Sequence, residues 1–449
     1  MAQRMNSRLQ IFTIILGLGV FLWCGGLVPA WGEGTVAFNA DKNEEFSSSP
    51  TPWAADYIRK RPYLIYSGKH TGMTVLWQTY QTPSQATIEW GTTTGYGKGP
   101  MIVHENSSSS DQHQFSYTIP NLNPGTKYHY RVTNDTYSHT GSFITAPPPG
   151  QTRVSFYGYG DTRAEYLDTP DDHNSVLGAL LDDMDMNPDE RQTLLVHLGD
   201  YVYNGLNEFL WDRQQFNLDP DYDHIYKTFA NLPFMGVLGN HEGYDAHAEK
   251  NHICILNYQN IGELFRKYYP YHYPNRNRFY YSFDYGPIHF VIIDTWSYQG
   301  ASSKQTIDDV QANWLKRDLK ASNKLWKIAM LHTPIWDCMK GNETMQAQLT
   351  PILKHGGVHL VLQGHRHYYS HAETEGEYAG MTYLTLGGGG AKLDPEMACV
   401  HENNKKWPPF AAFKFHFARF DISENTMTVT VIGNDGAEIE QFQITNLNN

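Results

Sequence analysis

Five short apolar runs in the middle and second half of the chain each lead to polar residues. The runs cover residues 153–160, 194–198, 231–238, 327–331 and 358–362, and the polar residues that follow them are Asp161, Asp200, Asn240, His332 and the pair His365 and His367. A short apolar run bounded by turn residues is typical of a strand that is buried on both faces. Because the carboxyl ends of parallel strands gather at one edge of an open α/β sheet, we expect these polar residues to meet there.

The residue types at these strand ends predict a metal site. A single aspartate after a strand is more often a turn former or a helix cap, but its recurrence at five strand ends favours a functional interpretation. Oxygen and imidazole donors together suit iron, zinc or manganese better than calcium or a thiolate site.

Residues 152–445 alternate between apolar strands and helical segments, which predicts an α/β domain. Residues 175–184 and 308–321 have the helical period. Residues 413–420 and 427–432 alternate with a period of two, and we expect them to form antiparallel strands that close a second sheet against the first. The architecture implied is a four-layer α/β/β/α sandwich with the site at the strand tips.

Residues 57–147 have the pattern of a small all-β sandwich. Apolar and polar positions alternate along residues 74–78, 86–90, 114–119 and 127–132. Residues 121–128 resemble the corner before a late strand in fibronectin type III domains, where a tyrosine hydroxyl, here that of Tyr128, returns to the backbone. We interpret this domain as a spacer and packing partner, with carbohydrate binding as the alternative.

The N-terminal segment is predicted to direct secretion. In residues 1–30, the basic Arg4 and Arg8 precede an apolar stretch, and Ala30 offers a small residue for cleavage. An uncleaved membrane anchor is the alternative. Residues 31–56 are predicted to be a linker. We therefore expect a secreted, periplasmic or extracellular protein with no stable membrane span after cleavage.

The charge and the cysteine content indicate which partners and which cellular compartment to expect. The formal net charge of −13 argues against broad nucleic-acid binding, which usually needs a basic face. After the signal, the cysteines are Cys254, Cys338 and Cys399, and one disulfide among them fits an oxidising compartment. The sequence leaves open which two would pair, and it leaves the oligomeric state open as well.

The ligand motifs resemble the five metal-binding blocks of the calcineurin-like metallophosphoesterases. The blocks are Asp161, Gly199-Asp200-x-x-Tyr203, Gly239-Asn240-His241-Glu242, His332 and Gly364-His365-x-His367. The tyrosine three residues after the second aspartate is the mark of one branch, the purple acid phosphatases, in which an N-terminal fibronectin-like domain is also usual. The likeness covers nearly all of residues 57–445, including residues 279–294, which resemble the family's hairpin before the fourth block.

The resemblance implies two metal sites with one shared ligand. The first site, ferric in the family, would use Asp161, Tyr203 and His367, the second site would hold a divalent ion with Asn240, His332 and His365, and Asp200 would bridge both. The expected cofactors are therefore Fe(III) with Zn, Mn or Fe(II). A shared anionic ligand is physically reasonable, because two cations about 3.5–4 Å apart repel one another.

The resemblance also implies an acid phosphatase that hydrolyses phosphate monoesters. A metal pair lowers the pKa of a bound water, and the hydroxide attacks phosphorus in line. His241 resembles the family's histidine that contacts phosphate or aids the leaving group, and Glu242 could orient it. The partners would be small phosphorylated substrates. A phosphodiesterase, nucleotidase or phytase on the same scaffold is the first alternative, and an inert surface-binding protein is the second.

Two departures from the family's pattern bear on the chemistry. Arg163 stands where many purple acid phosphatases have glycine and other members have a histidine ligand, and a guanidinium cannot bind a metal. Tyr203 is therefore more necessary to complete the first site, and Arg163 is a candidate for holding a phosphate oxygen or a loop carboxylate. Residues 333–340 lack the histidines that help protonate the leaving group in plant members. Asp337, His247 or His252 could take that role.

Overall fold

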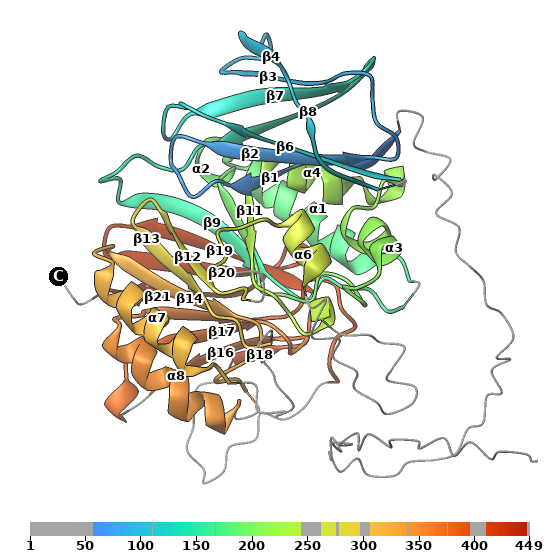
Figure 1. Ribbon diagram of the computed structural model, residues 1–449. Coiled ribbons are helices and arrows are strands. Elements are labelled where there is room, and N and C mark those ends of the chain that lie inside the picture. Colours follow the sequence, from blue (N-terminus) through green and yellow to red (C-terminus); the bar gives the residue numbers. More distant parts are fainter. Residues whose placement is uncertain are drawn as a thin grey trace, which may run out of the picture. The chain divides into compact units, whose positions relative to one another are not determined.

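The structure is a computed structural model, and it describes most of the chain from residue 57 onward (Figure 1). The described residues are 57–109, 111–166, 168–243, 262–274, 278–296, 306–338, 341–374, 376–395 and 410–446. The predicted signal peptide and linker lie outside them, as do His247, His252, Cys254 and Cys399.

Three sheets organise these residues. The first has ten strands in the order β21-β20-β19-β9-β10-β11-β1-β2-β6-β5. Its strands are β1 (Ile58–Tyr66), β2 (Met73–Thr79), β5 (Glu105–Ser109), β6 (Gln112–Ile119), β9 (Arg153–Tyr159), β10 (Leu194–His197), β11 (Phe234–Gly236), β19 (His416–Ser423), β20 (Thr426–Gly433) and β21 (Glu438–Thr445). At its centre β9, β10 and β11 run parallel, so their carboxyl ends share one edge.

The second sheet supplies the other half of the catalytic region. Its seven strands follow the order β12-β13-β14-β15-β17-β16-β18. They are β12 (Tyr281–Tyr285), β13 (Ile288–Ile292), β14 (Trp326–Leu331), β15 (Leu360–Gln363), β16 (Tyr369–Glu373), β17 (Thr382–Leu386) and β18 (Phe410–Ala412). The neighbours β13, β14, β15 and β17 are parallel, and the expected hairpin over residues 279–294 is present as β12 and β13.

Helices cover the outer faces of the two large sheets, as Figure 1 shows. The main helices are α1 (Asp171–Asp185), α4 (Asp223–Asn231), α7 (Asp309–Ala321) and α8 (Glu343–His355), and the short ones are α2 (Pro188–Arg191), α3 (Glu208–Leu210), α6 (Glu263–Tyr268), the π-helix η1 (Trp211–Gln215) and the 3₁₀ turns η2 (Pro220–Tyr222), η3 (His241–Gly243) and η4 (Gly376–Tyr378). No helix among the described residues is long and apolar enough to cross a membrane.

Apolar contacts join these elements into four layers. Val176 and Leu180 on α1 belong to the core that also fills the space between the sheets. There, the rings of Phe156 on β9 and Phe290 on β13 lie 5.3 Å apart at their centroids. On the far side, α7 and α8 share a separate apolar cluster with the second sheet. The predicted α/β/β/α sandwich is confirmed.

The N-terminal strands form the predicted all-β sandwich. A third sheet, with the order β4-β3-β7-β8, packs over β1, β2 and β6 around a common apolar core. Its strands are β3 (Ala86–Gly91), β4 (Lys98–Ile102), β7 (Lys127–Asn134) and β8 (Tyr137–Ile144). The expected tyrosine corner is present, because the Asn123 amide donates a hydrogen bond of 3.0 Å to the Tyr128 hydroxyl.

Two sheet pairings differ from the expectation. The C-terminal strands do not close the second sheet: β19 pairs antiparallel with β9 and extends the first sheet, so that prediction is wrong. A period of two identifies a strand and its buried face but not its neighbour. The N-terminal sandwich also joins the first sheet, through a parallel bridge between Ile65 on β1 and Phe234 on β11. The domain boundaries at 57–147 and 152–445 stay predictions.

A buried charge network fastens the N-terminal strand β1 to the segment that follows the Asp200 motif. Arg59 and Lys60 have almost no exposed surface. Lys60 Nζ lies 2.8 Å from Glu208 Oε1, and Arg59 Nη2 lies 2.7 Å from Asp212 Oδ2. Removing one partner from such a pair leaves a buried uncompensated charge, which is strongly destabilising. The network therefore holds α3 and η1 in place beside the site.

Candidate metal centre

The ligand residues predicted from the sequence lie together where parallel strands of both large sheets end. Asp161 follows β9, Asp200 follows β10, Asn240 follows β11, His332 follows β14, and His365 and His367 follow β15. Backbone hydrogen bonds fix neighbouring tips to each other: the Asp161 amide donates to Gly199 O at 2.9 Å, and the Gly364 amide donates to His332 O at 2.9 Å.

The turns that present three of these side chains adopt an uncommon backbone conformation. Asp161, Asp200 and His365 have φ angles of 60°, 58° and 68°. Aspartate and histidine enter this left-handed region more readily than most residues, but at some energetic cost. Such strain tends to gather at functional sites, and here all three residues contribute candidate ligand atoms.

The carboxylate and imidazole atoms form two groups that share one residue. Asp161, Asp200 and His367 make one group, and Asp200, His332 and His365 make the other, with the candidate atoms of each group within 4.8 Å of one another. Asp200 thus stands between two sets of donors, which is the place expected of a bridging ligand.

The side chain of Asn240 belongs with the second group. Its Oδ1 lies 2.9 Å from His332 Nε2 and 3.0 Å from His365 Nδ1, and these two ring nitrogens are 3.3 Å apart. Three donor atoms of the types that bind zinc, iron or manganese therefore face one point.

Hydrogen bonds at the far ring nitrogens orient two of the histidines. His332 Nδ1 donates to Leu198 O at 2.7 Å, and His367 Nδ1 donates to Lys392 O at 2.8 Å. A proton held at Nδ1 leaves Nε2 with its lone pair free for a metal. The donor set of the centre thus fits a pair of metal ions.

Electrostatics at the centre also favour cations. Asp161 and Asp200 have 0% and 2% of their surface exposed. Burial, together with the nearby charge of Asp200, raises the pKa of the Asp161 carboxyl well above its usual value. Burial alone would lower the pKa of His332, but the Asp200 carboxylate raises it to about 9. Two buried carboxylates need positive charge nearby to stay ionised together.

His241 lies at the edge of the centre, and hydrogen bonds hold both its backbone and its ring. Its amide donates to Asp200 Oδ1 at 3.0 Å, and its Nδ1 donates to Tyr203 O at 2.5 Å. Its Nε2 is 3.9 Å from Asp200 Oδ2. This geometry leaves Nε2 directed toward the centre, where it could meet a phosphate oxygen or a leaving group.

The suggestion that Glu242 orients the His241 ring is wrong, because Tyr203 O takes that role. The Glu242 carboxylate is buried and accepts three backbone amides instead, from Gly239 at 2.8 Å, Asp200 at 3.0 Å and Tyr201 at 2.8 Å. It therefore ties the loop after β10 to the loop after β11.

Tyr203 and Arg163 lie beside each other at the rim. The Arg163 guanidinium carbon is 5.6 Å from the centroid of the Tyr203 ring, and that ring is 5.6 Å from the His241 ring. Arg163 Nε is buried, lies 4.0 Å from Asp200 Oδ2 and makes no hydrogen bond within the described part of the chain. Both side chains thus lie at the rim of the centre, and Arg163 can offer a donor to an anion.

Sequence reasoning missed three residues that support the loops. His197 Nδ1 accepts the Gly199 amide at 3.2 Å, so Nε2 carries the proton and donates to Thr162 Oγ1 at 3.1 Å. Gln214 Oε1 accepts the Tyr203 amide at 2.8 Å. Two of these contacts join separate elements, β10 to the loop after β9 and η1 to the loop after β10. Only the polar character of Thr162 and His197 next to the ligand motifs could have indicated them.

The remaining described candidate for the leaving-group role, Asp337, is held within its own loop. Asp337 is buried, accepts the Gly341 amide at 2.8 Å and lies 3.8 Å from Arg366 Nε, so it holds its own loop. Cys338 is disulfide-bonded, which agrees with the single disulfide expected from the sequence.

Comparisons with known proteins agree with this geometry. The family model for calcineurin-like phosphoesterases matches residues 133–369, and the model for the N-terminal domain of purple acid phosphatases matches residues 60–145. A purple acid phosphatase of Glycine max is 24% identical and aligns with 81% of this chain and 79% of its own length. A probable inactive purple acid phosphatase of Arabidopsis thaliana is 22% identical, over 72% of this chain and 55% of its own.

Solved structures support the fold. The structure of a purple acid phosphatase from yellow lupin (Lupinus luteus) seeds aligns with a TM-score of 0.68 and 18% identity, covering 86% of this chain and 74% of the lupin chain.

The chain belongs to the calcineurin-like phosphoesterase family. Within that family its two domains and its relatives are those of the purple acid phosphatases, which confirms the resemblance recognised in the sequence. The protein is accordingly a phosphatase enzyme that hydrolyses phosphoesters.

Proposed function

We propose that this protein is a binuclear, metal-dependent acid phosphatase that hydrolyses phosphate monoesters. The observation that carries the proposal is the position of Asp200, which belongs to both groups of candidate ligand atoms. We assign Asp161, Tyr203 and His367 to a ferric site, and Asn240, His332 and His365 to a site for Zn, Mn or Fe(II), with Asp200 between them.

The metal pair and the chain have separate tasks in this proposal. When bound, two metal ions lower the pKa of a water molecule and neutralise charge on the phosphate. His241 and Arg163 orient the substrate, because each directs a side-chain nitrogen toward the space beside Asp200. Hydrogen bonds that His332 and His367 donate from Nδ1 to Leu198 O and Lys392 O keep the Nε2 atoms of these two histidines available.

We also propose that the protein works in a secreted, periplasmic or extracellular setting. The signal-like residues 1–30 and the bonded Cys338 support this, because disulfides persist in oxidising compartments.

A pair of chromogenic substrates tests the reaction class. The protein should release p-nitrophenol from p-nitrophenyl phosphate at acidic pH, lose this activity after chelation and recover it when metals are returned. Faster hydrolysis of bis-p-nitrophenyl phosphate would instead indicate a phosphodiesterase. Equal activity before and after complete metal removal, verified by elemental analysis, would contradict the proposal.

A further inference from the structure

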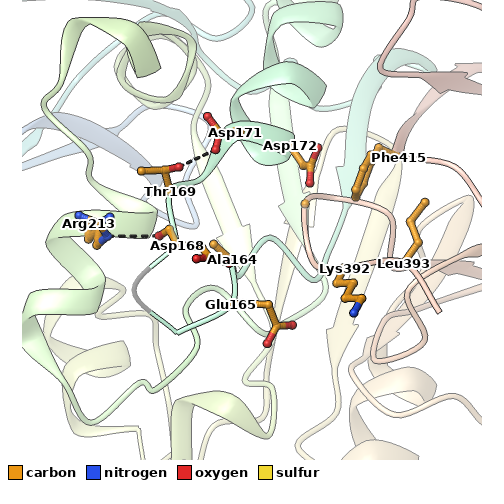
Figure 2. A pocket seen from close by; sticks show the side chains of 11 residues that line it. Ala164, Glu165, Asp168, Thr169, Asp171, Asp172, Arg213, Lys392, Leu393 and Phe415 are labelled. Atoms are coloured by element: carbon orange, nitrogen blue, oxygen red, sulfur yellow. Dashed lines mark hydrogen bonds between the residues drawn. The ribbon is translucent and has the colours of Figure 1, made fainter. Parts of the chain in front are cut away.

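A cavity of about 660 Å³ opens next to the candidate metal centre, and Figure 2 shows the side chains around it. Its walls come from the loop that follows Asp161, the first turn of α1 and the loop over residues 390–393. Two contacts connect it with the centre. Lys392 O accepts the ring proton of the candidate ligand His367, and Glu165 pairs at 3.3 Å with Arg163.

The charges in this cavity are unbalanced. Its lining includes four carboxylates, Glu165, Asp168, Asp171 and Asp172, and two cations, Arg213 and Lys392, so the formal charge is −2. Partial desolvation and the adjacent Asp171 raise the pKa of Asp172, as expected for crowded carboxylates. A cation in the cavity would relieve this crowding, whereas an anion would add to it.

The lining is also partly apolar. Phe415 and Leu393 line the same cavity as the carboxylates. An alkylammonium group presents apolar methylene or methyl groups around a positive charge, and aromatic rings and carboxylates both attract such a group. The combination of an aromatic ring, an aliphatic side chain and excess negative charge suits this chemistry.

We propose that this cavity, which we call the acidic pocket, is the leaving-group subsite and selects phosphate monoesters of cationic alcohols over esters whose leaving group is anionic. The inference rests on the proposed phosphatase function. In the reaction, a water oxygen forms a bond to phosphorus, the ester P–O bond breaks, and the alcohol leaves with a proton. The phosphate lies at the metal centre while the alcohol portion occupies the acidic pocket.

Three substrates that differ in leaving-group charge test the inference. With the metal-loaded enzyme at fixed pH and low ionic strength, kcat/KM should fall in the order phosphocholine, glycerol 2-phosphate, 3-phosphoglycerate. We expect about a tenfold spread between the first and the last, and salt should reduce it because these charges are solvent-exposed.

Charge variants give the matched controls. The double variant Asp168→Asn with Asp172→Asn should reduce the spread to about threefold, and Lys392→Gln should widen it, because it removes a cation. Asp189→Asn, on α2 and outside the pocket, should leave the spread unchanged. Inhibition by inorganic phosphate, which has no leaving group, should be equal in all of these proteins.

The possible failures are distinguishable. Hydrolysis of all three substrates with no charge order, or with an order that the Asp168→Asn/Asp172→Asn variant preserves, would overturn the pocket assignment. The pocket assignment would also be overturned if a charge variant changed inhibition by inorganic phosphate as much as it changed kcat/KM for phosphocholine. If the metal-loaded enzyme hydrolyses none of the three, the proposed function itself fails.

Discussion

The metal centre and the acidic pocket are neighbours, but their side chains are held in opposite ways. At the centre, Asp161 and Asp200 are buried, and the imidazoles of His332 and His367 are oriented by backbone carbonyls. In the pocket, Asp172 is exposed, and Lys392 makes no ion pair with any other described residue. Fixed donors suit a reaction that needs one geometry, whereas a loosely held rim suits selection among substrates.

This contrast predicts two sizes of effect. Substitutions of the candidate metal ligands should change metal content and rate for every substrate alike. Substitutions in the pocket should alter substrate preference by small factors and leave the metals in place.

Asp200 should give the largest effect. In Asp200→Ala, both metal sites lose an anionic ligand, so kcat/KM should fall by roughly 10³-fold or more, equivalent to about 4 kcal/mol, and metal content should fall with it. Elemental analysis and p-nitrophenyl phosphate hydrolysis measure the two outcomes. Asp183→Asn is the control, because Asp183 is also a buried carboxylate but pairs with Arg191 and Arg419 away from the centre. An Asp200 variant with full metal content and rate would contradict the bridging assignment.

The next effect separates metal ligands from their neighbours. His332→Ala and His365→Ala should deplete the divalent ion selectively, since their ring nitrogens face Asn240 Oδ1. His241→Ala should keep both metals and lose about 10–100-fold in rate, as is typical of groups one contact away from the metal. Metal loss in the His241 variant would show that this histidine is a ligand.

Substitution of Tyr203 should change the visible absorption spectrum of the protein and leave its fold intact. A trivalent cation can displace the phenol proton far below its free pKa of about 10, and a ferric phenolate should give a visible absorption band. The oxidised protein should therefore be coloured, and Tyr203→Phe should be colourless with an unchanged circular dichroism spectrum. A wild-type protein that is colourless while holding iron would assign Tyr203 to packing beside Arg163 instead.

Thr162 should give the smallest effect at the centre, because its hydroxyl contacts His197 and the Tyr201 carbonyl rather than a candidate ligand atom. Thr162→Val keeps the shape of the side chain but leaves His197 Nε2 without its partner, which costs about 1–3 kcal/mol of stability. Thermal unfolding should detect this loss, while metal content stays constant and the rate falls only a few-fold. A loss of rate as large as in His241→Ala would mean that this hydrogen bond sets the ligand geometry itself.

The sequence was sufficient to predict the layers and the convergence of the ligand motifs, for a local reason. Each candidate ligand lies directly after an apolar run, so the strand and the side chain at its tip are adjacent in sequence, as for Asp161 after β9. The unexpected sheet pairings, in contrast, join strands that are far apart in the sequence. The bridge between Ile65 and Phe234 and the pairing of β19 with β9 join distant segments, and alternation of apolar residues does not specify such partners.

The hydrogen bonds that hold the ligand loops were also harder to predict, because they join different segments of the chain. Glu242 accepts amides from two loops, and Gln214 reaches back to the backbone of Tyr203. Backbone groups carry no signal in the sequence, so these roles become visible only in three dimensions. The acidic pocket is similar, because its carboxylates and Lys392 come from segments more than two hundred residues apart.

Metal stoichiometry in the wild-type protein tests the central claim most directly. Elemental analysis of the purified, fully active enzyme should find two metal ions per chain, one of them iron, since two groups of donors meet at Asp200. Full activity with one metal ion per chain, or with none, would contradict a binuclear centre bridged by Asp200.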